Sequence, residues 1–370
     1  MNIIYLGGFD LPDKNAAAQR VIANAKLFDV LGYTVTLIGL DKRFEEFTYE
    51  GFDCINLKYP SNVLEWTSYL LLTNKYRKYI EKLKPQMIVA YNHPAFALNN
   101  LASLCKANGI KLISDCTEWY TPEGNVFFKL IKGWDTRKRM KKTHLKLDGI
   151  ISISRYLHEY YLEKGAKSLL LPPLVDIENS QWDGCLEKTN SKVLRLVYAG
   201  SPGHKDRLDT IVNVISKSNK RNIAFSIIGI DEQQFRELYH FQESIPVSVS
   251  FKGRLSHADT LKELKTSDFQ IFVREDNITT RAGFPTKFVE SISAGIPVLT
   301  NLTSNIGDYL SDGNNGFVLD VSSEKSLIIS LEKVFALSNE EILNVKQSID
   351  RKTFDYHRYI PQMKEFIETL

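Results

Sequence analysis

Short apolar stretches of strand length alternate with helical patterns along most of the chain. The first such unit runs from an apolar stretch at 2–6, through Gly7-Gly8, to a helical pattern at 16–31 and a second apolar stretch at 34–38. A strand, a glycine-rich loop, a helix and a strand in this order begin a doubly wound sheet. Open parallel sheets bind their ligands beyond the carboxyl ends of the strands. The alternation therefore predicts an α/β fold and directs attention to the residues that follow each strand.

The alternation falls into two blocks, as a chain of 370 residues allows. In the first block, further strands are expected at 52–57, 87–90, 111–114, 149–153 and 168–171, and further helices at 63–83, 95–107, 126–147 and 155–164. In the second block, strands are expected at 193–198, 223–229, 247–251, 269–273 and 296–299, and helices from 206 onward and at 286–294, 324–337, 340–349 and 356–370. We therefore expect two Rossmann-like domains, 1–172 and 193–355, joined by a polar linker at 173–192.

The composition excludes several classes of protein. The four cysteines are scattered without C-x-x-C spacing, which argues against a zinc site or a disulfide framework and favours a reducing compartment. No charged and then apolar leader opens the sequence, and no apolar run reaches the ~20 residues that a spanning helix needs. The net charge is only +3, so any basic surface must be local. We expect a cytoplasmic protein.

The most informative stretch of the second block contains the helix expected at 286–294, which follows Pro285. Free amides, the positive end of the helix dipole, the Thr286 hydroxyl and the Lys287 ammonium can converge at its start to bind an anion. Glu290 lies one turn further along the same face. This pattern predicts a nucleotide, with phosphate at Thr286 and Lys287 and ribose at Glu290. The alternative is a packed helix on which Lys287 and Glu290 form a solvated pair.

The sequence Gly-Phe-Pro-Thr-Lys-Phe-Val-Glu at 283–290, followed by Gly-Ile-Pro-Val, closely resembles the donor-nucleotide motif of family 4 glycosyltransferases. Members of that family are retaining enzymes of the GT-B fold, in which two Rossmann-like domains face each other across a cleft. The family motif reads E-x7-E. Glu290 matches its second glutamate, but Ala282 stands at the first, which helps to hold the donor sugar. Other bacterial members also have Gly-Phe-Pro-Thr-Lys without the first glutamate.

Two glycine-containing turns of the second block are further donor-site candidates. Gly200 and Ser201 follow a strand, and Lys205 lies just before the next helix, as in a loop that faces phosphate. The resemblance implies that Lys205 binds the diphosphate; the alternative is a surface lysine. It also implies that the turn with Arg254 and Leu255 meets the nucleobase edge. In GT-B proteins the last helix, here 356–370, crosses back onto the first domain.

Two arginines flank the central motif. Arg274 closes the preceding strand and Arg281 opens the motif. Guanidinium groups near a phosphate can form bidentate clamps, and one of these two is a candidate replacement for the missing glutamate. The alternative is an ion pair that holds Arg274 against Glu275 or Asp276.

In the first block, the residues after the first and fourth strands are candidates for ligand contacts. Gly7 and Gly8 allow a ligand to approach the backbone, and the alternative is a tight turn. His93 precedes Pro94 at the end of a strand. It is a candidate acceptor-binding residue, as a general base or as a donor to a sugar hydroxyl. The alternative is a histidine with only a turn-forming role.

A carboxylate and two aromatic residues follow the fifth strand. Asp115, or Glu118 three residues later, can orient or deprotonate an acceptor hydroxyl, and Trp119 and Tyr120 can stack on a sugar face. The alternative for Asp115 is a helix N-cap. Many family members have a histidine here that contacts the donor sugar. This chain has Asp115-Cys116 at that place instead, so the role of the histidine does not carry over. Lys205, Lys287 and Asp115 are our catalytic candidates.

The stretch 126–147 has eight Lys or Arg against one Asp. Its apolar residues fall at helical spacing on one face, and they are Phe127, Leu130, Ile131 and Trp134. A basic amphipathic helix of this kind can lie on an anionic membrane. The alternative is a helix that covers the sheet with a solvated basic face. The resemblance favours the inner membrane leaflet, where lipid-linked acceptors reside. No module or basic–aromatic interleaving indicates nucleic-acid binding.

Together these features predict a glycosyltransferase that moves a hexose-type sugar from a nucleotide sugar, most often UDP in this family, to a hydroxyl of a glycan or lipid-linked acceptor. No Asp or His cluster with metal-ligand spacing is present in the sequence, so we expect no metal or other cofactor. Retention, by same-face transfer in which the leaving phosphate accepts the acceptor's proton, follows from the resemblance. The alternatives are a nucleotide-sugar epimerase of similar fold and a non-catalytic subunit that binds sugar nucleotide or glycan beside an active transferase.

Overall fold

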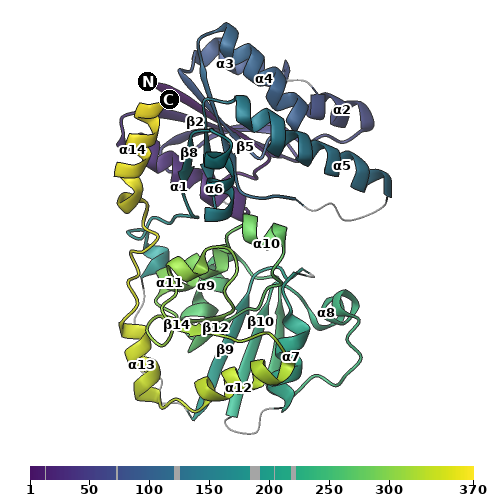
Figure 1. Cartoon of the computed structure of the whole chain (residues 1–370), viewed down its shortest axis with the longest axis vertical. Helices are drawn as coiled ribbons and strands as arrows, with labels where there is room; N and C mark the ends of the chain where they lie inside the picture. The colour runs from purple at the N-terminus through teal and green to yellow at the C-terminus, as the bar shows by residue number, and fades with distance from the viewer. Residues whose placement is uncertain (13, 72–73, 121–125, 184–191, 204, 218–221) are drawn as a thin grey trace. The chain divides into compact units, whose positions relative to one another are not determined.

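The structure is a computed structural model that describes residues 1–370 except 13, 72–73, 121–125, 184–191, 204 and 218–221. Contacts divide the chain into two compact units. The first comprises Met1–Asp176, Arg281–Phe284 and Tyr356–Leu370, and the second comprises Ile177–Thr280 and Pro285–Asp355. Each unit has its own sheet with helices packed on it (Figure 1). The expected α/β class, with two doubly wound parallel sheets, is confirmed.

The first unit is built on an eight-stranded sheet of order β3-β4-β2-β1-β5-β6-β7-β8. Its strands are β1 (Asn2–Gly7), β2 (Thr34–Asp41), β3 (Glu45–Tyr49), β4 (Phe52–Lys58), β5 (Met87–Tyr91), β6 (Lys111–Cys116), β7 (Gly149–Ser152) and β8 (Ser168–Leu170). Neighbouring strands are parallel except for β3, an antiparallel edge strand that the sequence analysis missed. In β1, Ile3 and Tyr5 join one core cluster while Ile4 and Leu6 join another. Both faces of the sheet are therefore buried, which explains the continuous apolar runs.

Seven helices of the described residues surround this sheet. They are α1 (Ala16–Val30), α2 (Val63–Leu71), α3 (Asn74–Leu83), α4 (Ala95–Ala107), α5 (Val126–Lys138), α6 (Arg155–Glu163) and α14 (Ile360–Thr369). The Asn15 side chain caps α1 by accepting a hydrogen bond from the Ala18 amide (2.9 Å). The helix expected at 63–83 is described as α2 and α3, and residues 72–73 between them lie outside the described residues. At the end of the chain, α14 packs beside α1 (Figure 1). It buries Met363 and Phe366 in the core cluster that also contains residues of α1.

The basic stretch at 126–147 is not one α-helix. It continues from α5 into a π-helical turn (Arg139–Thr143) and a 3-10 turn (His144–Lys146), where Arg139, Met140 and His144 are buried. Leu130, by contrast, is 67% exposed and Trp134 is 53% exposed. The exposed apolar residues thus belong to the first part of the stretch, whereas exposed cations occur along both parts. No helix among the described residues is long and apolar enough to span a membrane.

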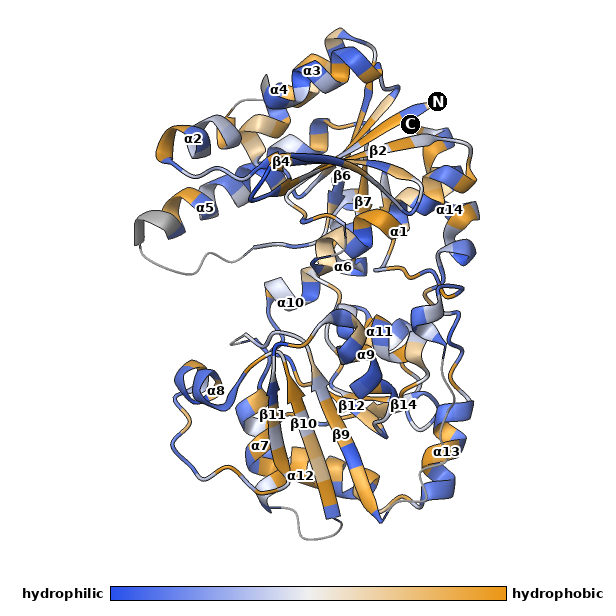
Figure 2. Cartoon of the chain, turned by 180° about the vertical axis from the view of Figure 1, so that it is seen from behind, coloured by the Kyte–Doolittle hydropathy of each residue, from blue (hydrophilic) through white to orange (hydrophobic). Residues whose placement is uncertain are grey.

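The second unit has a six-stranded parallel sheet of order β11-β10-β9-β12-β13-β14. Its strands are β9 (Val193–Ala199), β10 (Asn222–Ile228), β11 (Val249–Gly253), β12 (Phe269–Ile271), β13 (Val298–Thr300) and β14 (Gly316–Val318). Its helices are α7 (Leu208–Lys217), α8 (Glu232–Tyr239), α9 (His257–Lys265), α11 (Thr286–Ala294), α12 (Glu324–Phe335) and α13 (Asn339–Gln347). The short α10 (Ile278–Ala282) contains the boundary between the units. Figure 2 shows that β9 and β10 are mainly hydrophobic, as buried parallel strands require.

Asp115 at the end of β6 is fully buried in an ion pair with Arg20 of α1. The Arg20 guanidinium donates to both carboxylate oxygens, at 2.8 Å from Nη2 to Oδ1 and 2.9 Å from Nε to Oδ2. The Tyr5 hydroxyl also donates to Oδ2 (2.5 Å). The prediction that Asp115 handles an acceptor hydroxyl is therefore wrong, because its oxygens are occupied and out of reach. It is not an N-cap either; it ties α1 and β1 to β6.

We expect the substitution Arg20→Ala to destabilise the first unit by ~3–5 kcal/mol, because it leaves a buried carboxylate without its cation. Lys111→Ala is the matched control, since it breaks the solvent-exposed pair with Asp148 and should change stability by less than ~1 kcal/mol. Urea denaturation of both variants measures the difference. Equal losses would contradict the structural role assigned to the buried pair.

Candidate functional site

The loop after β9 and the chain after β12 lie side by side in the second unit. These two strands are neighbours in the parallel sheet, so their carboxyl ends meet at one edge. The Glu275 amide donates to the Lys205 carbonyl (3.0 Å) and clips the two segments together. As a result, Asp206 from the first segment faces Arg274 from the second, with 3.9 Å between Asp206 Oδ1 and Arg274 Nε.

Lys287 reaches the same carboxylate from the first turn of α11. Its Nζ donates to Asp206 Oδ1 (3.2 Å) and to the Tyr198 hydroxyl (2.7 Å), and it lies 4.1 Å from the centre of the Tyr198 ring. Gly200 provides the space for this approach. A Cβ at Gly200 would lie 3.6 Å from Lys287 Cε, and its φ of 127° is a conformation that side chains disfavour. We call Arg274 and Lys287 around Asp206 the cation cluster. Lys205, just before Asp206, is exposed, and its diphosphate contact stays a prediction.

Burial sets the electrostatics of the cation cluster. It lowers the pKa of Lys287 to about 8, against the opposing effect of Asp206. Burial alone would raise the pKa of Asp206, but the fields of the cations, Lys287 foremost, outweigh it and lower that pKa. Two cations, Lys287 and Arg274, face one carboxylate, which leaves an excess of one positive charge. The site therefore suits an anion.

Arg274 carries an unused hydrogen-bond donor. The side chain is 6% exposed, and its Nη1 has no hydrogen-bond partner among the described residues. Asn301 fixes the Arg274 backbone by accepting from its amide (2.9 Å) and donating to its carbonyl (2.8 Å). A buried polar group left unpaired costs about 1–3 kcal/mol of folding free energy. A hydrogen bond from Arg274 Nη1 to a bound anion would offset this cost. The alternative of Glu275 or Asp276 as the ion-pair partner is wrong, since Arg274 faces Asp206.

The start of α11 agrees with the prediction. The helix begins at Thr286 after Pro285, which is its N-cap, and Gly295 caps its end. Thr286 is half-buried in the first turn. Glu290 lies one turn on, with 3.6 Å between its Oε1 and His257 Nε2 at the start of α9. Its ribose contact stays a prediction.

The other donor candidates of the second block are exposed. Ser201 follows Gly200 in the loop after β9, and Arg254 and Leu255 follow β11. Arg281 is exposed in α10. These positions are compatible with ligand contacts, and their roles stay predictions.

Ala282, at the position of the family's first glutamate, is buried. Its carbonyl accepts a hydrogen bond from the Ser154 hydroxyl (2.8 Å), which also caps α6. The residue is thus part of the packing of the first unit, and its side chain presents no polar group to a sugar.

Gly7 has a packing role in the first unit. A Cβ at Gly7 would lie 2.7 Å from Tyr91 Cβ and from the Tyr91 carbonyl oxygen, so the close contact of β1 with β5 requires glycine. Packing alone therefore explains Gly7. Gly8 is exposed, and its ligand contact stays a prediction.

His93 is fully buried, and burial lowers its pKa to about 3, so the ring is a weak base. Burial thus disfavours a general-base role of His93, and its contact with an acceptor hydroxyl stays a prediction.

The aromatic residues after β6 already have neighbours. Trp119 packs edge-on against Tyr160 of α6, with 5.0 Å between ring centres. The Lys132 ammonium lies 4.3 Å from the centre of the Tyr120 ring. Glu118 is half-buried beside them. Acceptor binding by these three residues stays a prediction.

Comparison with known proteins relates the second unit to a known family. Residues 187–348, which include the whole cation cluster, match the family described as Glycosyl transferases group 1. This part of the chain is therefore similar to that family. No curated protein matches the chain.

Solved structures extend the likeness over both units. Sucrose-phosphate synthase from Thermosynechococcus elongatus is 13% identical, with a TM-score of 0.71 over 100% of this chain and 98% of its own. HepE from Anabaena, in complex with UDP-glucose, is 13% identical with a TM-score of 0.69 over 100% of both chains. The catalytic domain of starch synthase IV from Arabidopsis thaliana, bound to ADP and acarbose, is 10% identical with a TM-score of 0.73 over 99% of both. The GT-B fold is confirmed.

Two residues of the second unit's site, Asp206 and Tyr198, escaped the sequence analysis. Asp206 follows Lys205 directly, and a carboxylate beside an expected phosphate-binding lysine was the available signal. Tyr198 is the second-last residue of an apolar strand and reads as core. Its hydroxyl becomes informative only when Lys287 is placed against it.

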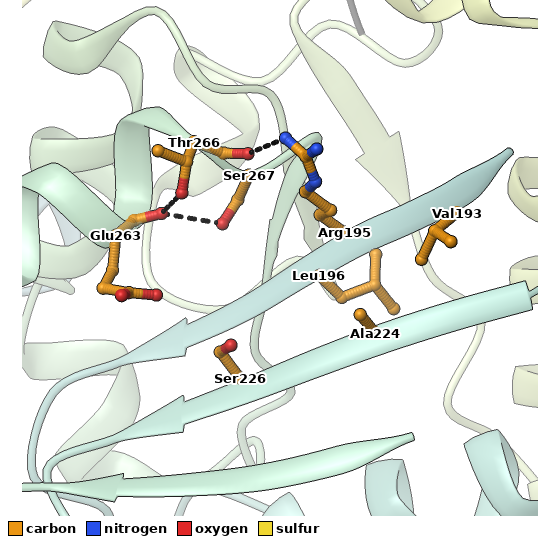
Figure 3. Close-up of a pocket in the computed structure, with 8 residues that line it drawn as sticks. All are labelled: Val193, Arg195, Leu196, Ala224, Ser226, Glu263, Thr266 and Ser267. Carbon is orange, nitrogen blue, oxygen red and sulfur yellow. Dashed lines mark hydrogen bonds between the residues drawn. The ribbon is translucent and has the colours of Figure 1, made fainter. Parts of the chain in front are cut away.

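A cavity of about 300 Å³ lies elsewhere in the second unit, between the β9–β10 face of the sheet and the end of α9 (Figure 3). Its lining residues are Val193, Arg195, Leu196, Ala224, Ser226, Glu263, Thr266 and Ser267. None of them was a site candidate. The Arg195 guanidinium that borders the cavity donates to the Thr266 carbonyl (3.2 Å). The cavity therefore does not change the assignment of the site to the cation cluster.

The Lys287 side chain should titrate with a midpoint near pH 8 in the ligand-free protein, because burial disfavours its charged form. The ammonium is thus present below that pH and lost as the pH rises through it. NMR of lysine-labelled protein measures the midpoint, with Lys287→Arg to identify the resonance. Asp206→Asn should lower the midpoint further, since it removes the charge that favours the ammonium. A midpoint near the ordinary value of 10.5 would contradict the burial of this cation.

Proposed function

We propose that the protein is a glycosyltransferase that moves a hexose-type sugar from a nucleotide sugar to a hydroxyl of a glycan or lipid-linked acceptor, with retention. The observation that carries this proposal is the cation cluster, with its one excess positive charge and the unpartnered Nη1 of Arg274. A nucleotide diphosphate supplies the matching anion. UDP is our choice of nucleotide, supported by the UDP-glucose complex of HepE.

The cations would act on the leaving group. As the bond from the sugar C1 to the diphosphate oxygen breaks, negative charge grows on the phosphate, and preorganised cations stabilise it. An ammonium has three N–H donors, and Lys287 uses two of them, toward Tyr198 and Asp206. The third remains for a phosphate oxygen, and Arg274 Nη1 offers another donor. We propose that these cations suffice without a metal.

The acceptor oxygen then bonds to C1 on the same face, and its proton passes to the departing phosphate oxygen. This proposal needs no protein carboxylate as base. Its support in the structure is that Asp115, the carboxylate first expected to act on the acceptor, is held by Arg20. In this scheme the second unit binds the donor and the first unit binds the acceptor.

A second candidate is a non-catalytic subunit that binds the sugar nucleotide beside an active transferase. The observation that favours it is the buried Ala282, which offers no carboxylate to the donor sugar. Nucleotide binding without transfer or hydrolysis of any nucleotide sugar would distinguish this candidate from an enzyme.

Calorimetric titration of UDP, GDP, ADP and TDP, with EDTA present, tests the donor site. We expect one nucleotide to bind at micromolar concentration and Lys287→Met to weaken it by about ten- to a hundredfold, the value of about 1.5–3 kcal/mol for a hydrogen bond to a charged group. Lys262→Met is the matched control, because this lysine is exposed on α9 of the same unit. If none of the four binds, or if both variants behave alike, the nucleotide-sugar proposal fails.

We also propose that the first unit contacts an anionic membrane surface as a peripheral protein in the cytoplasm. Exposed apolar side chains lie on two helices that both pack on α4. They are Val63, Leu64 and Trp66 on α2 and Leu130, Ile131 and Trp134 on α5. Exposed cations accompany α5 and the turn after it, namely Lys129, Lys132, Arg137, Lys141 and Lys142. Apolar side chains edged by cations are the composition that binds anionic lipid.

Co-sedimentation with vesicles tests this membrane contact. The double variant Leu130→Ser/Ile131→Ser should weaken binding to vesicles that contain phosphatidylglycerol by roughly tenfold or more, because two exposed apolar side chains no longer enter the interface. Ile329→Ser, at an exposed position on α12, should have no effect. Equal binding to purely neutral vesicles, or no loss in the double variant, would overturn the proposal.

A further inference from the structure

His93 lies in a buried polar cluster at the carboxyl end of β5. Its ring packs edge-on between Tyr69 and Tyr76, with 5.9 and 5.6 Å between ring centres. His93 and Tyr76 are buried, while Tyr69 and Lys75 are partly exposed and form the outer side of the cluster. The Tyr69 hydroxyl also lies over Gly8 at the end of β1. The cluster therefore occupies the edge of the first sheet where a parallel sheet binds ligands.

Several polar atoms of this cluster lack partners. Both ring nitrogens of His93, the Tyr76 hydroxyl and Arg139 Nε have no hydrogen-bond partner among the described residues. Arg139 is nevertheless held in place, because its Nη1 donates to the Asn92 carbonyl (3.0 Å). Native proteins leave few buried polar atoms unpaired, and four in one place indicate a ligand or ordered water.

The charges of the cluster are unbalanced. Arg139 has a counter-charge in Asp135, which also accepts a hydrogen bond from the Ala95 amide (2.9 Å). Lys75 has none: no carboxylate among the described residues is within ion-pair distance, and its Nζ lies over the Tyr69 ring at 3.9 Å. Burial without a counter-ion lowers the pKa of Lys75 to about 8. The cluster thus has one positive charge without a counter-charge among the described residues, which favours an anionic ligand.

The remaining groups suit a sugar ring. Burial keeps His93 neutral, so one ring nitrogen donates and the other accepts, as a sugar hydroxyl requires. The tyrosine rings offer apolar surface beside these polar atoms.

We propose that Lys75, His93, Tyr69 and Tyr76 form an acceptor subsite that selects an anionic sugar, whose carboxylate or phosphate binds Lys75 while a ring hydroxyl binds His93. This inference rests on the proposed function and names its acceptor class. A free acidic sugar and the phosphate-bearing sugar of a lipid-linked acceptor share this chemistry. Ordered water alone is the competing occupant.

Binding of three probes tests the subsite: p-nitrophenyl β-D-glucuronide, glucose 6-phosphate and the neutral p-nitrophenyl β-D-glucoside. Calorimetry on the full chain should show at least one anionic probe binding about tenfold or more tightly than the neutral one. A preference for the glucuronide indicates an acidic sugar, and one for the phosphate indicates a sugar phosphate. Lys75→Met should reduce the preference to less than about twofold, whereas Lys75→Arg, which keeps the charge, should retain it.

Lys78→Met, on the same helix, is the matched control and should keep the preference. UDP titrations of every variant separate the two levels of the proposal, since the donor site lies in the other unit. Loss of the anionic preference with intact UDP binding in Lys75→Met supports the subsite. No preference in the wild type, or an unchanged preference in Lys75→Met, overturns it and leaves water as the occupant. Anionic preference without any nucleotide binding would instead remove the proposed function and keep the subsite.

Discussion

The account depends on one carboxylate, Asp206, which lies between two buried cations. Without it, Lys287 and Arg274 would be desolvated beside each other with no counter-charge, and their repulsion would disfavour the observed approach of α11 to the loop after β9. With it, Lys287 keeps a pKa of about 8 and is mainly charged at neutral pH. The neutralisation is partial, because the two cations share one carboxylate. The fold thereby holds an anion-binding site ready before any ligand arrives.

The buried polar networks differ in whether all their hydrogen bonds are made. In the first unit, the Arg20–Asp115 pair has all of its hydrogen bonds and joins α1 to the sheet, so it serves packing. The neighbouring His93 cluster and the cation cluster of the second unit instead retain unpaired donors and excess charge. At the sheet edges, polar groups with all their hydrogen bonds made are structural, and those with unpaired donors are candidate binding groups. The exposed fraction alone does not distinguish the two kinds, since all three networks are largely buried.

The sequence predicted what short-range patterns determine. The helix at 286–294 was found because a proline precedes it and a glycine ends it, and Lys287 was placed in its first turn. The sequence alone could not reveal contacts between residues that lie far apart in the chain. Asp115 at a strand end looks the same whether it serves catalysis or packing, and Arg20 lies 95 residues away. Likewise Arg274 has two acidic neighbours in sequence, but the sheet order pairs it with Asp206.

The most direct test of the central claim is a crystal structure of the protein with UDP. The account predicts diphosphate oxygens within about 3.2 Å of Lys287 Nζ and Arg274 Nη1, with Asp206 still facing both cations. A nucleotide bound elsewhere, with Arg274 Nη1 still unpaired, would contradict it.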